Sequence, residues 1–248
     1  ASEIGTSVFD NLEEIENCLN ANHANDWANM LPEERGAILT SISNDLENEP
    51  YELIYYLMHE AGKTIQNAID EIREAIDFLR YYSKEIIDLT KKDNTLEGPT
   101  GEINVLSYSS KGHFLCISPW NFPVAILIGQ ISAALACGNR VTIKPSEHTS
   151  ILGYLIVQKF HKHGVPIDAL ELILGDGIYG DMLSKIKTVK GVAFTGSLET
   201  AKKIQTNLNN GHKEIIPLIA ETGGINVMIV DSSALLEQAT DDIIRSAF

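Results

Sequence analysis

The first part of the chain shows a helical pattern of apolar and polar positions. From residue 10 to about residue 90, apolar residues recur at steps of three and four, which is typical of helices with one buried face. One long helix is predicted by the apolar series Ile65, Ile69, Ile72, Ile76, Leu79 and Ile86. We expect a solvated face to be formed by acidic residues of this stretch, namely Glu71, Glu74 and Asp77. Residues 1–98 are therefore predicted to be an N-terminal helical segment that serves packing.

After residue 98 the pattern changes to short apolar runs. The runs "INVLSY" and "HFLCIS" predict two strands joined at residues 109–112. Further strands are predicted by "RVTIKP", "ELILG", "GVAFTG", "PLIAE" and "NVMIV", mostly separated by helical patterns at residues 124–136, 150–163, 179–185 and 198–208. Strands alternating with helices are typical of a parallel sheet covered on both faces. The expected fold class is therefore α/β, with a Rossmann-like domain over residues 99–248 and a boundary near residues 98–101.

Composition and charge narrow the class of protein. With 248 residues and 44% apolar composition, the chain is long enough for one large domain or two small domains with a proper core. The apolar stretch at 122–136 is interrupted by Gly129, Gln130 and Ser132, so we predict no membrane span. The formal charge of −15 works against binding to a phosphate backbone. We therefore expect a globular chain that does not bind nucleic acid.

The cysteines indicate the compartment. Cys18, Cys116 and Cys137 have neither the spacing of metal ligands nor an even number for pairing, which fits free thiols in a reducing compartment. We predict a cytoplasmic location and no metal site. The N-terminus has no secretory signal and no initiator Met, so we expect the chain to begin within a longer protein.

One carboxylate stands out in the run "LIAETGGINVMIVD". Glu221 interrupts an apolar stretch and is followed by Thr222, Gly223 and Gly224. Burial of an unpaired carboxylate costs several kcal/mol, so a carboxylate placed there suggests a function such as general base. Alternatively, the stretch is a strand edge or turn in which the glycines supply backbone freedom and Glu221 points at water. This stretch alone leaves both interpretations open.

The motif "SPWNFP" offers a rigid amide after a predicted strand. Pro119 and Pro123 restrict the backbone on either side of Asn121. A rigid amide donor beyond a strand is suited to stabilise negative charge on a carbonyl oxygen. This motif alone favours the alternative interpretation, a structural asparagine in a turn.

The motif "TIKPSEHTS" places a cation beside a carboxylate where a predicted strand ends and a predicted helix begins. Lys144 and Glu147 together suit a sugar diol, and an acidic residue at a ribose favours NAD over NADP. The same residues also fit a simpler function, in which Ser146 or Thr149 caps the helix and Glu147 favours its positive end. The two interpretations are compatible.

Two glycine-containing turns are candidates for phosphate binding. The run "ELILGDGIYG" has Gly175, Gly177 and Gly180 in G-x-G-x-x-G spacing between a strand and a helix. The run "AFTGSLET" offers Gly196 and Ser197 at the start of another helix, where free N–H groups favour phosphate. The spacing leaves either turn as the phosphate site.

Taken together, "SPWNFP", "IKPSE", "FTGS" and "ETGG", in this order, resemble the aldehyde dehydrogenase superfamily. The resemblance extends upstream to "EAGKT" and covers most of the chain. Within the superfamily, "ETGG" and "EAIDFLRYY" are most similar to the L-glutamate γ-semialdehyde dehydrogenase module of bifunctional proline utilization A proteins. The resemblance thus implies the fold of an aldehyde dehydrogenase, NAD as the cofactor and oxidation of L-glutamate γ-semialdehyde as the activity.

The resemblance also assigns roles to individual residues. It implies that Asn121 forms the oxyanion hole, that Glu221 is the general base and that Phe122 lines the channel for the aldehyde substrate. It implies an NAD site in which Gly196 and Ser197 form the pyrophosphate turn, with "GDGIYG" beside the adenosine pocket. The expected NAD contacts are Ser118, Pro119, Trp120, Lys144, Ser146, Glu147, Gly177, Phe194, Gly196, Ser197, Thr222 and Gly223.

The nucleophilic cysteine that the resemblance implies is expected beyond residue 248. None of the three cysteines fits that role, because Cys18 and Cys137 fall in helical patterns and Cys116 in an apolar strand. We therefore expect the chain to be about the N-terminal half of a dehydrogenase module, without most of the catalytic domain and inactive alone. The resemblance implies that the parent protein oxidises L-glutamate γ-semialdehyde to L-glutamate as a homo-oligomer. The similarity to proline utilization A proteins further implies fusion to a proline dehydrogenase module.

One alternative is another aldehyde dehydrogenase of the same superfamily, and two further alternatives share the fold but not the reaction. An acyl-phosphate reductase or CoA-acylating relative works without a hydrolytic base, so Glu221 argues against it. A non-catalytic scaffold with the same fold needs neither Asn121 nor Glu221, and the presence of both disfavours it.

Overall fold

The computed structural model describes residues 3–9, 11–20, 26–91 and 95–247. Its first part is helical, as predicted, although Asp10, where the predicted region begins, lies outside the described residues. Helix α2 begins with a proline, and the backbone N–H of Leu31 donates to Glu34 Oε2 (2.9 Å), which satisfies one free group at its start. The helices are α1 (Leu12–Asn20), η1 (Asp26–Asn29), α2 (Pro32–Asn48), α3 (Tyr51–His59) and α4 (Ile65–Lys91).

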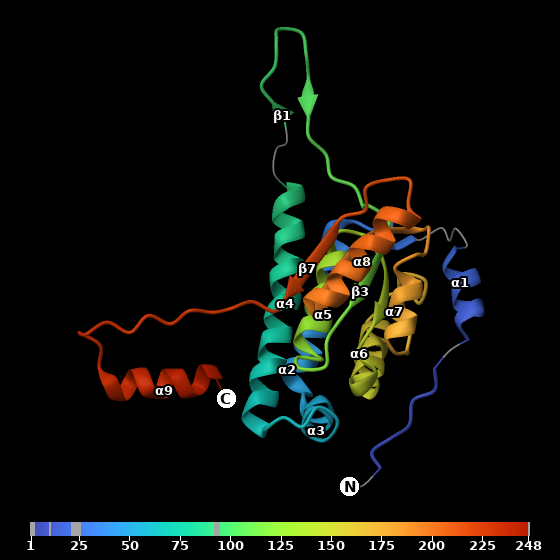
Figure 1. Cartoon of the computed structure of the whole chain (residues 1–248). Helices are drawn as coiled ribbons and strands as arrows, with labels where there is room; N and C mark the ends of the chain where they lie inside the picture. Colours follow the sequence, from blue (N-terminus) through green and yellow to red (C-terminus); the bar gives the residue numbers. More distant parts are fainter. Residues whose placement is uncertain (1–2, 10, 21–25, 92–94, 248) are drawn as a thin grey trace.

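Helix α4 packs one face into the molecule. Its buried positions include Ala68, Ile72, Ala75 and Leu79, and they share one core with α2 and with helices of the sheet. Across this core, Trp27 Nε1 donates a hydrogen bond to the carbonyl of Leu135 (2.9 Å). The long helix predicted from the apolar series is therefore confirmed, and Figure 1 shows it running alongside the sheet.

One prediction for α4 is wrong. Glu71, which we expected on the solvated face, is only 1% exposed, whereas Glu74 and Asp77 are exposed as expected. Glu71 follows Ala68 by three positions and precedes Ala75 by four, so it lies on the same side of the helix as these buried residues. The position of Glu71 along the helix therefore predicts its burial better than its acidic side chain does.

The sheet is parallel, with the strand order β5-β4-β3-β6-β7. Its strands are β3 (His113–Ile117), β4 (Arg140–Lys144), β5 (Leu170–Leu172), β6 (Val189–Gly196) and β7 (Leu218–Thr222). The connecting helices are α5 (Ala125–Ala136), η2 (Glu147–Thr149), α6 (Ser150–Lys162), α7 (Gly177–Leu183) and α8 (Leu198–Gly211). The expected Rossmann-like sheet with an N-terminal helical segment is confirmed.

Both faces of the sheet are covered. On β3, Cys116 joins the core formed with α5 and α6, whereas Leu115 and Ile117 join a second core with α7 and α8. This alternation is the period of two expected of a strand. From β3 the chain first builds the sheet toward β5 and then returns to add β6 on the other side of β3. Such a reversal creates a crevice at the carboxyl ends of the strands, where ligands bind in folds of this kind.

Two predicted strands differ from the structure. The run at 103–108 does not pair with β3; instead β2 (Asn104–Val105) pairs antiparallel with β1 (Thr95–Leu96), and this hairpin projects beyond α4 (Figure 1). The run at 226–230 is not a strand, because within the described chain no strand pairs with it. Helix α9 (Leu236–Ala247) follows it and has no buried residue.

Residues 98–101, where we place a domain boundary, contain the turn of the β1–β2 hairpin. The division into two domains itself stays a prediction. Over the described ranges, no helix is both long and apolar enough to cross a membrane.

A network of polar contacts lies at the amino-terminal ends of the strands. The ring nitrogens of His113 lie 3.1 Å from Thr188 Oγ1 and 2.8 Å from Thr142 Oγ1. Nearby, Arg140 donates from Nη2 to both carboxylate oxygens of Glu171 at 2.8 Å. Burial, reinforced by the charge of Arg140, lowers the pKa of His113 to about 3. The imidazole is therefore neutral in the folded protein near neutral pH.

We expect the stability of the chain to fall on acidification because of His113. In the unfolded chain the imidazole titrates near its ordinary value of 6.5, so below that pH the unfolded state binds more protons than the folded state. The free energy of unfolding should fall by up to about 1.4 kcal/mol per pH unit between pH 6.5 and 3, with no contribution above this window. Urea unfolding at pH 7.5, 6.5 and 5.5 measures this slope. His113→Gln, which does not titrate, should show a shallower slope, and equal slopes would contradict the assignment.

Candidate cofactor and active site

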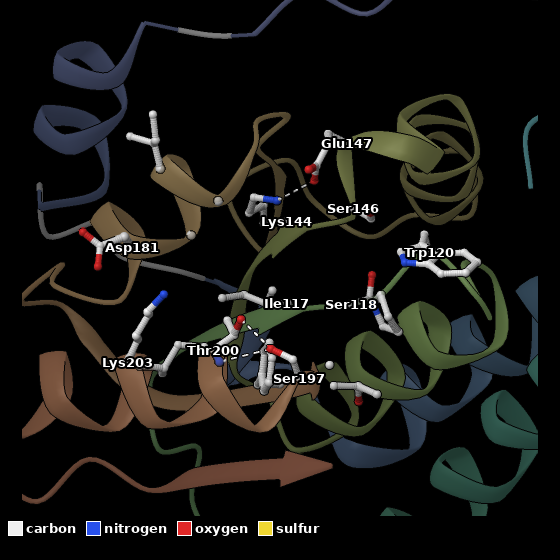
Figure 2. A pocket seen from close by; sticks show the side chains of 18 residues that line it. Ile117, Ser118, Trp120, Lys144, Ser146, Glu147, Asp181, Ser197, Thr200 and Lys203 are labelled. Carbon is white, nitrogen blue, oxygen red and sulfur yellow. Dashed lines mark hydrogen bonds and ion pairs between the residues drawn. The ribbon is translucent and has the colours of Figure 1, made fainter. Parts of the chain in front are cut away.

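A cavity of about 640 Å³ opens at the carboxyl ends of β3, β4 and β6. Figure 2 shows Lys144 and Glu147 on one wall and Ser197 and Thr200 on the opposite wall. The cavity therefore lies at the crevice where the strand order reverses. The predicted cofactor residues that line it are Ser118, Pro119, Trp120, Lys144, Ser146, Glu147, Gly177, Phe194, Gly196 and Ser197.

Lys144 ends β4 and is almost completely buried, at 4% exposure. Its Nζ donates to the carbonyl of Pro145 (3.1 Å) and lies 4.0 Å from Glu147 Oε2. Burial lowers the pKa of Lys144, and the charges of Glu147 and Asp176 act in the opposite direction. An ammonium donor beside a carboxylate acceptor is the arrangement that two neighbouring sugar hydroxyls require.

Helix α7 lies beside Lys144. A Cβ at Gly180 would lie 3.7 Å from Lys144 Cδ, which is an ordinary van der Waals distance. At the start of the same helix, Asp176 Oδ1 accepts a hydrogen bond from the N–H of Ile178 (2.8 Å). A carboxylate at this helix start repels phosphate. The turn at "GDGIYG" is therefore the poorer of the two candidate phosphate sites.

The other turn connects β6 to α8. Ser197 caps the helix: its Oγ accepts from the N–H of Thr200 (3.2 Å) and lies 2.9 Å from Thr200 Oγ1. A Cβ at Gly196 would lie 2.7 Å from Cζ of Phe194, so the turn packs directly on this buried ring and needs glycine. The first N–H groups of a helix lack partners within the helix and attract anions. This turn is therefore the better phosphate site.

Ser118 contributes a further polar group to the cavity. Its N–H donates to the carbonyl of Lys144 (3.2 Å), which ties the ends of β3 and β4 together. Its hydroxyl is buried and has no hydrogen-bond partner within the part of the chain that the structure describes. A buried hydroxyl without a partner is unfavourable, so this atom fits a ligand that donates or accepts at the cavity wall. The residues present thus fit a nucleotide with a ribose and a phosphate.

The structure places the predicted catalytic residues outside this cavity. Asn121 and Phe122 are exposed in the loop between β3 and α5. Glu221 lies on β7 opposite Thr195 of β6 and is exposed, as the strand-edge interpretation has it. Its role as general base stays a prediction.

Glu221 lines a second cavity, of about 560 Å³. Phe194 and Thr195 line both this cavity and the first, so they separate the two. Thr222, opposite Gly196, and Gly223 after it do not line the first cavity, so their predicted cofactor contacts stay untested. The expected cofactor residues at the ends of β3, β4 and β6 lie together around the first cavity, whereas Thr222 and Gly223, at the end of β7, do not line it.

Comparison with known protein families identifies the chain. The model of the aldehyde dehydrogenase family matches residues 4–248. The chain belongs to the aldehyde dehydrogenase family. The resemblance carried by "SPWNFP", "IKPSE", "FTGS" and "ETGG" is thereby confirmed.

Relatives of this aldehyde dehydrogenase chain are longer than the chain itself. The Bifunctional protein PutA of Salmonella typhimurium is 44% identical over 241 residues, which cover 95% of this chain and 17% of PutA. The 1-pyrroline-5-carboxylate dehydrogenase of Bacillus subtilis is 35% identical over 230 residues, which cover 90% of this chain and 44% of that protein. The chain thus spans less than half the length of either relative.

Solved structures share the fold of this aldehyde dehydrogenase chain. A crystal structure of bifunctional proline utilization A (PutA) protein matches it with a TM-score of 0.93 at 40% identity, covering 98% of this chain and 25% of the other. Betaine aldehyde dehydrogenase from Staphylococcus aureus, in complex with NAD+, matches with a TM-score of 0.83 at 27% identity, covering 90% of this chain and 44% of the other.

Two residues that contact the 120–122 loop or the helix start after it had no role predicted for them from the sequence of this aldehyde dehydrogenase chain. Glu71 is buried against the start of α5, and Lys63 lies over the ring of Phe122. For Glu71, the signal in the sequence was its position among buried apolar residues of α4. Nothing in the sequence pairs Lys63 with Phe122, because the two are far apart along the chain.

Proposed function

We propose that this chain forms the NAD-binding part of a dehydrogenase that oxidises L-glutamate γ-semialdehyde to L-glutamate, the second step of proline catabolism. The cavity that combines the buried Lys144 beside Glu147 with the Gly196–Ser197 turn carries the proposal. The substrate is proposed from the similarity to PutA and to 1-pyrroline-5-carboxylate dehydrogenase, and the cofactor also from the relative in complex with NAD+.

The residues of the cavity would hold the two halves of the dinucleotide backbone. Glu147 would accept hydrogen bonds from the ribose hydroxyls and Lys144 would donate to them, while an added phosphate there would be repelled by Glu147. The Ser197 turn and the start of α8 would hold the pyrophosphate. Bound NAD supplies the acceptor for the hydride that leaves the aldehyde carbon. The arrangement therefore favours NAD over NADP.

Asn121 and Glu221 would act on the substrate. The Asn121 amide would donate a hydrogen bond to the carbonyl oxygen as negative charge develops on it during attack by a cysteine of the parent protein. The attack would give a thiohemiacetal, which becomes a thioester when its hydride is lost to the acceptor. Glu221 would then take a proton from the water that hydrolyses the thioester, which releases the acid and frees the thiol. Cys116 is not that nucleophile, because burial in β3 raises its pKa to about 12. We therefore expect this chain alone to bind NAD but not to oxidise aldehydes.

We expect saturable binding of NAD to this chain. Trp120 lines the cavity and is 58% exposed, so tryptophan fluorescence, together with the thermal midpoint, should report binding. Glu147→Gln should weaken NAD binding by about tenfold and narrow the preference over NADP, because it removes the charge that accepts the ribose hydroxyls and repels the extra phosphate.

Glu214→Gln is the matched control for this titration. Glu214 is an exposed carboxylate that pairs with Lys190 (2.8 Å) and does not line the cavity, so its loss should leave NAD binding unchanged. Absence of saturable NAD binding by the folded chain would contradict the proposal and favour a non-catalytic scaffold. Equal affinity for NADP would contradict the role of Glu147.

Further features of the parent protein are proposed on the same basis. Fusion to a proline dehydrogenase module is proposed because the PutA relatives are named bifunctional. A homo-oligomer is proposed from the family resemblance alone. A cytoplasmic location agrees with the free thiols of Cys116 and Cys137.

A further inference from the structure

The loop that carries Asn121 is attached to α4 through a buried carboxylate. Glu71 of α4 is buried, and its Oε1 accepts hydrogen bonds from the N–H groups of Val124 (2.7 Å) and Ala125 (3.1 Å). These groups lie at the start of α5, directly after the loop, and Val124 itself provides no side-chain cap. Glu71 therefore caps α5 from another helix and fixes where the loop ends.

A lysine continues this contact to the ring of Phe122. Lys63 Nζ lies 2.5 Å from Glu71 Oε2 and 3.8 Å from the centre of the Phe122 ring, and its side chain is only 11% exposed. The lysine is held in the turn before α4 by the hydrogen bond from its N–H to the carbonyl of Leu57 (3.0 Å). A cation over an aromatic ring at this distance is attractive. Lys63 thus joins Glu71 to the residue that follows Asn121.

The loop has little other side-chain packing to hold it. Trp120 and Phe122 are 58% and 41% exposed, and Asn121 is exposed between them. Pro119 and Pro123 restrict the backbone at both ends, but a proline does not fix the direction in which the intervening side chains point. The contacts of Lys63 and Glu71 supply that restraint.

We propose that Lys63 and Glu71 are positioning residues that hold the 120–122 loop so that the Asn121 amide faces the reacting carbonyl. Neither residue touches the substrate; both act through Asn121. The inference rests on the proposed function for the role of Asn121, whereas the restraint on the loop itself depends on the contacts alone. A small displacement of a group that stabilises the transition state is enough to lower the rate by orders of magnitude.

The restraint is tested first on this chain by nuclear magnetic resonance and by iodide quenching of Trp120. We expect Lys63→Met to shift and broaden the side-chain amide signals of Asn121, which are identified by their loss in Asn121→Ala, and to increase the quenching of Trp120. Glu71→Gln keeps an oxygen that accepts from the helix start but loses the charge that holds Lys63, so a smaller effect is expected. Lys84→Met is the control. Lys84 is an exposed lysine on α4, the helix that carries Glu71, and its replacement should change neither the Asn121 signals nor the quenching of Trp120.

NAD affinity measured on the same variants separates this inference from the proposed function. Lys63 and Glu71 do not line the NAD cavity, but Trp120 of the restrained loop does, so the variants should lose NAD affinity by a few-fold at most. Weak NAD binding by the unaltered chain would count against the proposed function only. Unchanged Asn121 and Trp120 signals in Lys63→Met and Glu71→Gln would overturn the restraint, whether or not NAD binds.

The catalytic consequence is tested in the full-length enzyme. Lys63→Met should lower kcat by about ten- to a hundredfold with a much smaller change in the KM for NAD, because the transition-state contact of Asn121 is disturbed most. In an Asn121→Ala background the same substitution should cause no further loss. Full additivity of the two losses would show that Lys63 does not act through Asn121 and would overturn the positioning role.

Discussion

Replacing Asn121 with alanine in the full-length protein is expected to lower kcat for the proposed oxidation of L-glutamate γ-semialdehyde by about 10²- to 10³-fold. Asn121 is exposed in the loop between β3 and α5, where its amide would be able to donate to a substrate oxygen. Alanine removes the donor that would stabilise the negative charge in the transition state, while Pro119 and Pro123 keep the loop backbone restricted. Steady-state kinetics of NADH formation measure the loss.

The loss should appear in kcat and leave NAD binding intact, because Asn121 lies outside the cavity that Lys144 and Glu147 line. Asn209→Ala, at an exposed position on α8, is the matched control and should leave kcat unchanged. A full rate in Asn121→Ala would exclude Asn121 from the oxyanion hole. Equal weakening of NAD binding would instead indicate that Asn121 itself contributes to the cofactor site.

The second large effect concerns stability. We expect Phe160→Ala to lower the free energy of unfolding by about 3 to 5 kcal/mol. Phe160 lies on α6, is fully buried and belongs to the core shared by the N-terminal helices and the sheet. Its removal deletes a large apolar contact and leaves a cavity that the surrounding helices fill only in part. Urea unfolding followed by circular dichroism gives the difference.

Tyr154→Ala on the same helix is the control, because Tyr154 is 50% exposed and alanine is a good helix former. A change within about 0.5 kcal/mol is expected for it. A loss at Phe160 no larger than at Tyr154 would show that α6 is not anchored in the core through Phe160.

The parallel sheet was predictable because its strands carry a strong local signal. Each inner strand is a short apolar run bounded by turn residues, and Cys116 and Ile117 face different cores because neighbouring side chains in a strand alternate. Site residues also followed from local rules, since Lys144 and Gly196 both lie where a strand ends. In a parallel sheet, those ends come together at one edge.

The remaining features depend on partners that the local pattern does not contain. The run at 226–230 has the composition of a strand, but a strand needs a neighbour to accept its hydrogen bonds. Glu71 was misassigned because its partner, Val124, lies 53 residues away in the chain. Periodicity shows which side of a helix is apolar, but it does not show that a carboxylate on that side caps another helix.

The position of β3 also bears on how the chain folds during its synthesis. β3 is the middle strand of the described sheet and the first of its strands in the sequence. As the ribosome releases the chain, β4 meets a completed β3, β5 meets β4, β6 meets β3 and β7 meets β6. Each of the four later strands of the described sheet therefore has a hydrogen-bonding neighbour already synthesised when it emerges. The sheet can grow outward from its centre, and no late strand has to insert between two earlier ones.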